Sequence, residues 1–239
     1  MRRLFISDLH LTEVDSPQYR GFVRLLHTAR QHADQLYILG DLCEVWVGDD
    51  DDAPLPCALQ DALRTASADL ALFFLPGNRD FLLGNDFAAQ CGLTLLTDPC
   101  RLDDATLITH GDQYCTDDTD YQRMRQMMRS NAWQQEILSR SLDERRALAA
   151  TLREHSIATK ANKPANIMDV NAAAIENALN DHSTRWLIHG HTHRPGVHAH
   201  GSGKRFALGA WEHCGWMVEQ SGVSEPQLSC FRLADRYET

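Results

Sequence analysis

The stretch RLFISDLH, residues 3–10, decides the fold. It begins with a largely apolar run of the length expected for a strand buried in a sheet, and that run ends at Asp8. Residues two apart in an extended segment face the same way, so Asp8 and His10 can reach one ion together. We therefore expect a buried strand whose carboxyl end carries polar ligands.

Strands and helices alternate along the chain after this stretch. Helices are expected at 17–33 and 55–68, and strands at 35–40, 69–78, 93–96, 105–109 and 185–190, with shorter β segments at 204–210 and 215–220. The first helix, for example, places Phe22, Leu25, Leu26 and Ala29 at helical spacing. Alternation of this kind indicates a sheet flanked by helices, which is an α/β fold.

Residues 117–181 interrupt the alternation. They are expected to be helical, with apolar residues such as Tyr121 and Met124 at helical spacing. The chain has no internal repeat and no low-complexity linker, and 239 residues with 43% hydrophobic content can bury one core. We predict one domain, in which a core formed by 1–116 and 182–239 carries a helical lid insertion at 117–181.

Charge and cysteine content limit the function and the compartment. The formal net charge of −10 argues against non-specific nucleic-acid binding, which needs a basic surface. The seven cysteines are an odd number without a C-x-x-C spacing, which favours free thiols in a reducing compartment. The apolar stretches Leu4–Ile6 and Leu70–Leu75 are too short for a signal-peptide core or a membrane span. We expect a cytoplasmic protein, which still permits attachment to a membrane surface.

Five fragments place polar side chains directly after an apolar strand. They are Asp8-Leu9-His10, Gly40-Asp41, Gly77-Asn78-Arg79-Asp80, His110-Gly111-Asp112 and Gly190-His191-Thr192-His193. In a sheet flanked by helices, ligands collect at the carboxyl ends of the strands, so all five fragments can converge. Each is a weak signal alone, because an Asp after a strand is often a helix cap and G-N-x-D is usually a turn. Five in succession indicate one polar site.

The candidate ligands of this site are Asp8, His10, Asp41, Asn78, His110, His191 and His193. Carboxylate, amide and imidazole groups without a thiolate suit Mn²⁺, Fe²⁺ or Zn²⁺ better than Ca²⁺. Seven ligands are too many for one ion and suit two. A bridging carboxylate would hold two ions roughly 3.5–4 Å apart, the separation that supports in-line displacement at phosphorus. The fragments therefore predict a two-metal phosphoesterase.

The order of the fragments, D-x-H, G-D, G-N-R-D, H-G-D and G-H-T-H, resembles the calcineurin-like metallophosphoesterase superfamily. The resemblance implies a four-layered αββα sandwich. It also implies that one ion takes Asp8, His10, Asp41 and His193, and that the other takes Asp41, Asn78, His110 and His191. Asp41 would then bridge the two ions.

Arg79 departs from the common superfamily pattern G-N-H-[DE], in which the histidine can protonate the leaving oxygen. An arginine cannot act as a general acid because its pKa is above about 12, but it can clamp phosphate oxygens. A phosphomonoester leaving group, with a second pKa of about 6, needs no proton. Arg79 therefore favours a pyrophosphate substrate over a simple diester. The alternative is a surface ion pair.

The lid is locally basic, with nine Arg and Lys residues against six acidic ones between 118 and 163. It also contains methionines and large apolar residues, among them Trp133 and Ile137. Flexible apolar groups can line a groove for lipid chains, and basic groups can lie near anionic headgroups. The alternatives are core packing for the apolar stripe and a solvated surface for the charges.

Longer blocks resemble the UDP-2,3-diacylglucosamine pyrophosphatases, a family within this superfamily. The blocks are GDLCEVWVGDD (40–50), GNRDF (77–81), HGDQYCTDD (110–118), IMDVN (167–171) and HGHTHRP (189–195). The resemblance implies Mn²⁺-dependent hydrolysis of UDP-2,3-diacylglucosamine in lipid A biosynthesis, with two Mn²⁺ per chain. Water would attack the α-phosphorus and release UMP and 2,3-diacylglucosamine 1-phosphate (lipid X). It also implies peripheral attachment to the cytoplasmic face of the inner membrane. We further expect a monomer that binds no nucleic acid.

The same resemblance implies roles for single residues. Asn78, Arg79 and His191 would act in catalysis, and the substrate would be bound by Asn78, Arg79, Asp118, Ser156, Lys160, Lys163 and His191. His189 is not expected to bind a metal, and is expected either to support a metal ligand or to be structural. Asp112 is expected to orient a metal-binding histidine, and Asp80 to steady the loop that contains Asn78. Two other functions stay open: a phosphodiesterase with the same metal core, and a non-catalytic binding scaffold.

Overall fold

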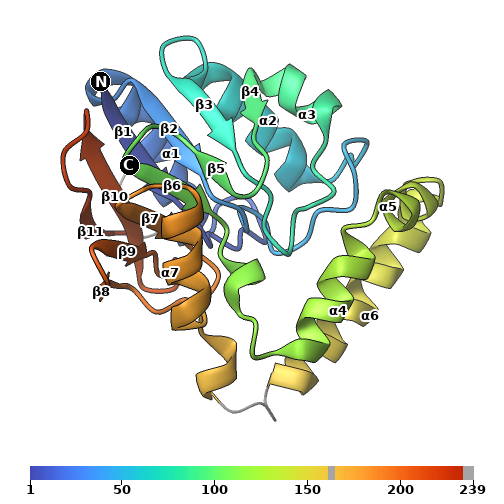
Figure 1. The fold of residues 1–239 in the computed structure, drawn as a ribbon. Helices are drawn as coiled ribbons and strands as arrows, with labels where there is room; N and C mark the ends of the chain where they lie inside the picture. Colours follow the sequence, from blue (N-terminus) through green and yellow to red (C-terminus); the bar gives the residue numbers. More distant parts are fainter. Residues whose placement is uncertain (161–164, 234–239) are drawn as a thin grey trace.

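Two β-sheets lie face to face at the centre of the fold (Figure 1). The computed structural model describes residues 1–160 and 165–233, and their side chains except those of 155–160, 165 and 166. The first sheet comprises, in order, β11 (Gln227–Arg232), β10 (Cys214–Ser221), β1 (Arg2–Ile6), β2 (Gln35–Ile38), β3 (Ala71–Phe74) and β4 (Leu93–Leu95). The second comprises β5 (Cys100–Arg101), β6 (Thr106–Thr109), β7 (Trp186–His189), β9 (Gly203–Ala207) and β8 (Gly196–His200).

The strands that precede the polar fragments run parallel within each sheet. In the first sheet, Ile6 of β1 pairs with Ile38 of β2, and Ile38 pairs with Phe74 of β3. In the second sheet, Thr109 of β6 pairs with His189 of β7. Parallel strands in register end at one edge of their sheet, so the loops that follow them emerge side by side.

The side chains of each strand divide between two apolar layers. In β1, Leu4 and Ile6 pack against the helices on the first sheet, whereas Phe5 packs toward the second sheet, as the two-residue period of a strand requires. Phe5 stacks on Tyr37 with ring centroids 5.0 Å apart, and Tyr37 stacks on Phe73 at 4.6 Å. This aromatic row fills the space between the sheets, together with residues of β6, β7 and β9.

Helices cover the outer faces of both sheets. They are α1 (Pro17–His32), α2 (Pro54–Ala66) and α3 (Asn85–Cys91) on the first sheet, and α7 (Ala172–Asp181) on the second. Side chains at helical spacing, such as Phe22 and Leu26 of α1, join the first apolar layer. The predicted four-layered αββα sandwich is confirmed. Helix α3 and strands β5, β8 and β11 lie in segments for which the sequence suggested no element.

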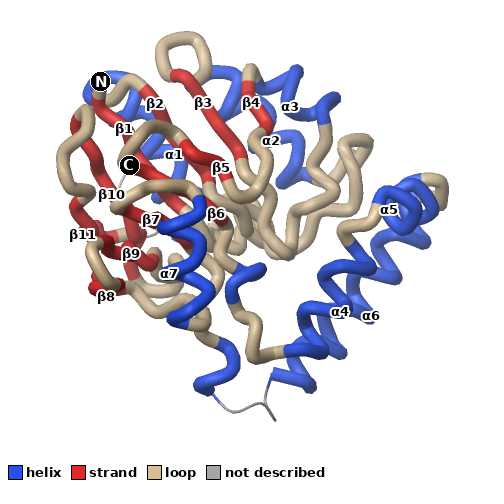
Figure 2. The backbone as a smooth tube through the Cα atoms, in the orientation of Figure 1, coloured by secondary structure: helices blue, strands red, loops and turns tan. Residues whose placement is uncertain are grey.

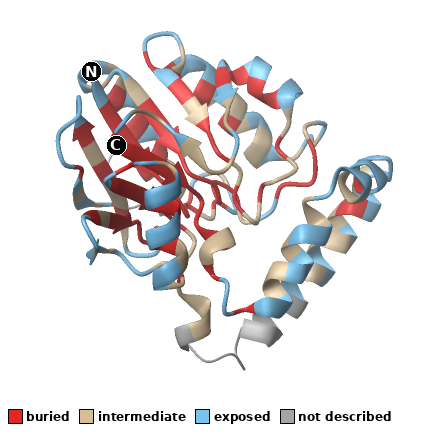
Figure 3. Ribbon diagram, in the orientation of Figure 1, coloured by how far each residue is buried: buried red, intermediate tan, exposed pale blue. Residues whose placement is uncertain are grey.

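Three helices project from this sandwich as an arm (Figure 2). They are α4 (Thr119–Met128), α5 (Asn131–Leu138) and α6 (Leu142–Lys160), and 3-10 turns η1 (Asp112–Tyr114) and η2 (Ala165–Met168) flank them. Most described side chains of the arm are exposed or half-buried (Figure 3), and α4 contains no buried residue. The apolar stripe of α4 is therefore not part of a closed core.

The end predicted for the helical insertion, residue 181, lies too far along the chain. Helix α7 falls inside the range 117–181, yet Ile175 and Leu179 pack against Leu107 and Leu187 of the second sheet. This helix forms the outer layer of the sandwich and does not belong to the arm. The helical pattern extended the insertion because it does not reveal what a helix packs against.

Two further expectations can be compared with the fold. All seven cysteines carry free thiols, as predicted. Within residues 1–160 and 165–233, no helix is both long enough and apolar enough to span a bilayer.

Candidate active site

The loops after β1, β2, β3, β6 and β7 bring the seven predicted ligand side chains together. Backbone hydrogen bonds join the first two loops, because the amides of Asp8 and His10 donate to the carbonyls of Gly40 and Asp41 at 3.1 and 3.0 Å. The loop after β7 is joined to them by the amide of His191, which donates to Asp8 Oδ2 at 2.9 Å. Convergence at the carboxyl edge of both sheets, expected from the sequence, is what the structure shows.

The first group of ligand atoms surrounds Asp8. His193 Nε2 lies 3.3 Å from Asp8 Oδ1 and 3.0 Å from His10 Nε2. His10 Nε2 lies 3.8 Å from Asp8 Oδ1 and also 3.8 Å from Asp41 Oδ2. Two imidazole nitrogens and two carboxylates that point at one position could hold a cation.

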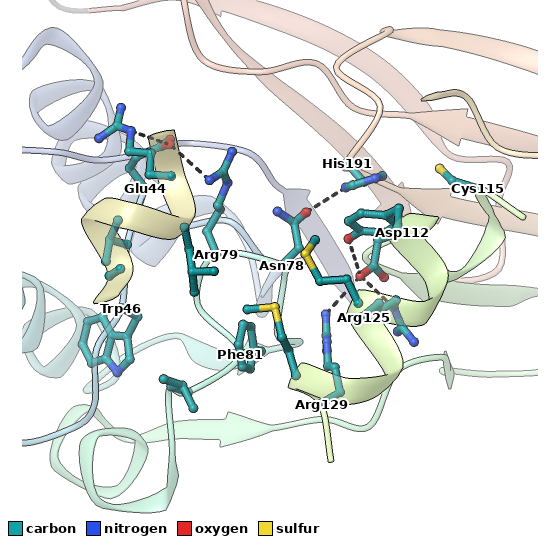
Figure 4. A pocket seen from close by; sticks show the side chains of 18 of the residues that line it. Glu44, Trp46, Asn78, Arg79, Phe81, Asp112, Cys115, Arg125, Arg129 and His191 are labelled. Atoms are coloured by element: carbon teal, nitrogen blue, oxygen red, sulfur yellow. Dashed lines mark hydrogen bonds and ion pairs between the residues drawn. The ribbon is translucent and has the colours of Figure 1, made fainter. Parts of the chain in front are cut away.

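The second group lies on the other side of the Asp41 carboxylate. His110 Nε2 is 3.7 Å from Asp41 Oδ1 and 3.0 Å from Asn78 Oδ1. His191 Nδ1 is 2.8 Å from the same Asn78 oxygen (Figure 4). Asp41 thus faces the first group through Oδ2 and the second group through Oδ1, which is the position that a bridging ligand needs.

Backbone strain marks the same residues. Seven described non-glycine residues have positive φ, and five of them are predicted ligands: Asp8, His10, Asp41, His191 and His193. A non-glycine residue in this region costs of order 1–3 kcal/mol and persists where the surroundings impose it, often at functional sites. A glycine is required beside them at position 77, because a Cβ there would collide with the Asp41 carboxylate and amide.

The buried charges of the site favour a cation. Burial lowers the pKa of His110, but the carboxylates of Asp41, Asp112 and Asp8 outweigh it and raise that pKa to about 9. His110 Nδ1 lies 2.8 Å from the carbonyl of Leu39 and donates to it, so Nε2 is directed at Asp41 and Asn78. The site therefore stabilises positive charge.

Asp80 supports the loops as expected. Its carboxylate accepts hydrogen bonds from the amides of Gly77 at 2.8 Å, Leu42 at 2.7 Å and Asp41 at 3.2 Å. It thereby joins the loop after β3 to the loop after β2. Burial, together with the charge of Asp41, raises the pKa of Asp80 to about 6.

A family model described as calcineurin-like phosphoesterase matches residues 1–195. The chain belongs to the calcineurin-like phosphoesterase family. The UDP-2,3-diacylglucosamine hydrolase of Aromatoleum aromaticum is 44% identical to it, over 95% of this chain and 96% of the relative. Those of Cellvibrio japonicus and Salmonella arizonae are 43% and 45% identical, over 93% and 92% of this chain and 96% and 95% of the relatives. These relatives confirm the resemblance to UDP-2,3-diacylglucosamine pyrophosphatases.

The fold of this phosphoesterase has a counterpart among solved structures. An archaeal phosphodiesterase superposes with a TM-score of 0.51 at 11% identity, covering 97% of this chain and 100% of that one. At this identity the likeness concerns the fold alone.

In this phosphoesterase, a cleft of about 480 Å³ lies between the cluster of candidate ligands and the arm. Its apolar lining comes from both sides: Val45, Trp46, Val47, Phe81 and Leu82 of the core, and Met124, Met128, Trp133, Ile137, Leu148 and Leu152 of the arm. Asn78, Arg79 and His191 line the same cleft, so the polar cluster opens directly into it (Figure 4). The apolar stripe of the arm thus lines a groove, which was one of the two alternatives for it.

Arg79 lies where the cleft meets the ligand cluster. Its Nη1 is 3.7 Å from Glu44 Oε1, and its side chain is only 16% exposed, so the ion pair that it forms lies in the wall of the cleft and not on the outer surface. Glu44 also lies 2.9 Å from His10 Nδ1, through Oε2, and Arg153 Nε lies 3.4 Å from Oε1. Nothing in the sequence singled out Glu44, although the block 40–50 contains it.

Asp112 was expected to orient a metal-binding histidine, but its hydrogen bonds serve another purpose. Among the described residues, the side-chain hydrogen bonds of its carboxylate come from the arm: from Tyr121 Oη at 3.1 Å, Arg125 Nε at 2.8 Å and Arg129 Nη2 at 3.3 Å. Arg129 Nη2 also donates to the carbonyl of Gly77 at 3.0 Å. Asp112 therefore attaches α4 to the core beside the ligand cluster. The two arginines could not be distinguished from the other basic residues of the lid by sequence.

The remaining predicted residues are placed as follows. Asp118 lines the cleft and caps α4, accepting the amide of Tyr121 at 3.1 Å. Ser156 and Lys160 lie on α6, but their side chains are outside those described, and Lys163 is outside the described residues altogether. His189 is buried with Nδ1 2.8 Å from the carbonyl of Gly190, and burial lowers its pKa to about 4, so the neutral ring is structural.

Proposed function

We propose that this phosphoesterase hydrolyses the pyrophosphate bond of UDP-2,3-diacylglucosamine. Water would attack the α-phosphorus, and the products would be UMP and lipid X. The observation that carries this proposal is the opening of a polar two-group ligand cluster into an apolar cleft, with Arg79 at the junction. A substrate with a pyrophosphate between a nucleoside and two acyl chains matches this arrangement, because its pyrophosphate can lie at Arg79 while its acyl chains lie in the apolar cleft.

The residues of the cluster fit two Mn²⁺ ions. Their donors are carboxylates, an amide oxygen and imidazoles, without a thiolate, and the buried carboxylates stabilise positive charge. In the proposed assignment Asp8, His10 and His193 would hold one ion, Asn78, His110 and His191 would hold the other, and Asp41 would contribute to both. When bound, such ions polarise phosphoryl oxygens and lower the pKa of a water molecule to be used as nucleophile.

The side chains at the cleft have separate tasks in the proposed reaction. The Arg79 guanidinium holds the oxygens of the pyrophosphate and stabilises the charge that builds up on them. It supplies no proton, and the leaving lipid X phosphate needs none because its second pKa is about 6. Asn78 and His191, which are joined at 2.8 Å, orient the phosphate being attacked.

The arm serves as the lid for the acyl chains in this proposal. Methionines and aromatic residues of the cleft adapt to flexible chains. Met127 and Leu138 of the arm are 55% and 43% exposed, and we propose that they and nearby basic residues rest on the anionic cytoplasmic face of the inner membrane. The protein would act there as a peripherally attached monomer.

The proposal is tested by assaying the purified, Mn²⁺-loaded protein on UDP-2,3-diacylglucosamine and on bis(p-nitrophenyl) phosphate. We expect efficient cleavage of the first, and in ¹⁸O-labelled water the label should appear in UMP. Activity on the diester alone would support the phosphodiesterase alternative. Label in lipid X would place the attack on the other phosphorus.

A further inference from the structure

A second, smaller cavity of about 210 Å³ begins at the first ligand group, since Asp8, His10 and His193 form part of its wall, and extends from there to Gln18 and Glu212. It shares Glu44, Arg79 and His193 with the large cleft, so the two cavities meet at the junction where the pyrophosphate is proposed to bind. The rest of its lining is Asp8, Leu9, His10, Gln18, Ala210, Trp211 and Glu212. None of these residues belongs to the arm. The cluster is therefore bordered by an apolar cavity under the arm and by a smaller, more polar cavity formed by the core.

Two polar side chains that line this cavity lack a polar partner in the described structure. Within the part of the chain that the structure describes, Gln18 and Glu212 make no side-chain hydrogen bond or ion pair. Gln18 is half-buried at the start of α1, and Glu212 is exposed. A glutamine amide offers a donor and an acceptor side by side, which match the imide edge of a uracil base. A carboxylate accepts hydrogen bonds from the hydroxyl groups of a ribose.

The backbone around these two residues is held in place. Ser16, two residues before Gln18, caps α1: its hydroxyl oxygen accepts a hydrogen bond from the amide of Tyr19 at 3.2 Å. The amide of Trp211 donates to the carbonyl of Asp8 at 3.0 Å, and its indole donates to the carbonyl of Trp216 at 3.2 Å. Glu212 thus follows a residue that is fixed to the ligand cluster itself. Because the walls of the cavity are already fixed, a ligand that binds there pays little entropy for ordering side chains and loops.

We infer that this cavity is the subsite for the nucleoside of a nucleoside monophosphate, with Gln18 contacting the base and Glu212 the ribose. The inference rests on the proposed function and deepens it. The substrate then lies across Arg79, with its acyl chains in the cleft under the arm and its nucleoside in the polar cavity. The subsite would select the uridine part of the substrate independently of the acyl chains.

The test measures product inhibition of the Mn²⁺-loaded enzyme by UMP, ribose 5-phosphate and lipid X. Gln18→Leu should weaken inhibition by UMP about 3- to 10-fold, the effect of one lost hydrogen bond, and leave ribose 5-phosphate and lipid X unchanged. Glu212→Gln should weaken both UMP and ribose 5-phosphate. Leu148→Ala, in the wall of the cleft, is the matched control and should weaken lipid X only.

Unchanged UMP inhibition in both Gln18→Leu and Glu212→Gln would overturn the inference, as would a loss of lipid X inhibition in either. Unfolding temperatures equal to that of the wild type establish that the variants are folded. Failure of the proposed function would look different, because the wild-type enzyme would then not cleave UDP-2,3-diacylglucosamine. In that case, titration of the wild type and Gln18→Leu with UMP by calorimetry would still decide whether the cavity binds the nucleotide.

Discussion

Glu44 Oε2 lies 2.9 Å from Nδ1 of His10, on the side of the ring opposite the nitrogen that faces the ligand cluster. A carboxylate on the far nitrogen fixes the orientation of a metal-binding imidazole and makes it a stronger ligand. Glu44 is itself held on the other side by Arg79 and Arg153, at 3.7 and 3.4 Å. It is therefore placed to orient both His10, a proposed metal ligand, and Arg79, the residue proposed to bind the phosphate.

Glu44→Ala should weaken binding of Mn²⁺ about 10-fold or more, because His10 loses the group that orients it. Calorimetric titration of the metal-free protein with Mn²⁺, without substrate, measures this directly. Glu44→Gln should recover part of the affinity, since its amide oxygen can accept from Nδ1. Glu136→Ala is the control, because Glu136 pairs only with Arg140 of the arm in the described structure. Wild-type affinity in Glu44→Ala would mean that the contact does not orient His10.

Asp41→Asn should remove most of the bound metal, because one carboxylate faces both ligand groups, at 3.8 Å from His10 and 3.7 Å from His110. The neutral amide keeps the shape of the side chain but loses the charge shared by the two ions. His193→Ala, which removes a ligand from the first group only, should retain about half of the wild-type content. Elemental analysis after dialysis separates these outcomes. If Asp41→Asn kept both ions, Asp41 would not be the bridge.

Arg79→Ala should reduce kcat by about 10²-fold or more, because the negative charge that develops on the phosphate is no longer stabilised by the guanidinium. Arg79→Lys should recover only part of the rate, because an ammonium lacks the planar fork of a guanidinium. Steady-state kinetics on the acylated substrate give both values. Metal content should equal that of the wild type in both variants, and depleted metal would show that Arg79 supports the ligand cluster instead of the substrate.

The ligand cluster was predictable because its signal is local. Asp8 and His10, like His191 and His193, are two residues apart after a strand, and parallel strands end at one edge. No long-range information is needed to infer that such fragments converge. Their backbone strain could not be predicted, because the positive φ of Asp41 occurs where Gly77 of another loop lies against it, a contact that the local sequence does not reveal.

The contacts of the arm could not be predicted because they join residues far apart in the chain. Arg129 bonds to Gly77, and Glu44 contacts Arg153, only because α4 and α6 lie over the loops after β2 and β3. A single arginine among nine basic residues has no pattern that marks its partner. The same reason explains the misplaced end of the insertion, since α7 has an apolar stripe whether it packs on a sheet or on another helix.

Alongside Arg146, which pairs with Asp51 and Asp52, the far end of the arm is attached by Arg145 of α6. Its guanidinium donates to both carboxylate oxygens of Asp50, at 2.7 and 2.5 Å, and to the carbonyl of Val47 at 2.7 Å. The Arg145 side chain is 4% exposed, whereas that of Asp50 is 62% exposed, so the pair is partly screened by solvent. Arg145→Met should loosen the N-terminal half of α6, although Arg146 and Arg153 keep their contacts with the core, and should speed the exchange of amide hydrogens there, measured by mass spectrometry. Arg123→Met, which loses only a pair within α4, should not.

The attachment should also depend on pH. The hydrogen bonds from Arg145 lower the pKa of the Asp50 carboxyl below its ordinary value. A carboxyl whose pKa is lower in the folded state stabilises that state above its unfolded pKa, about 3.9, and this contribution is lost as the pH falls through the folded-state pKa. Protection of α6, corrected for the intrinsic pH dependence of exchange, should therefore fall below about pH 4 in the wild type. Asp50→Asn should show lower protection and a smaller change over this range, because the contribution of Asp50 is lost while that of Asp52, whose pKa is lowered by the hydrogen bond from Arg146, remains. A wild-type pH profile in that variant would show that the Asp50–Arg145 pair does not attach the arm.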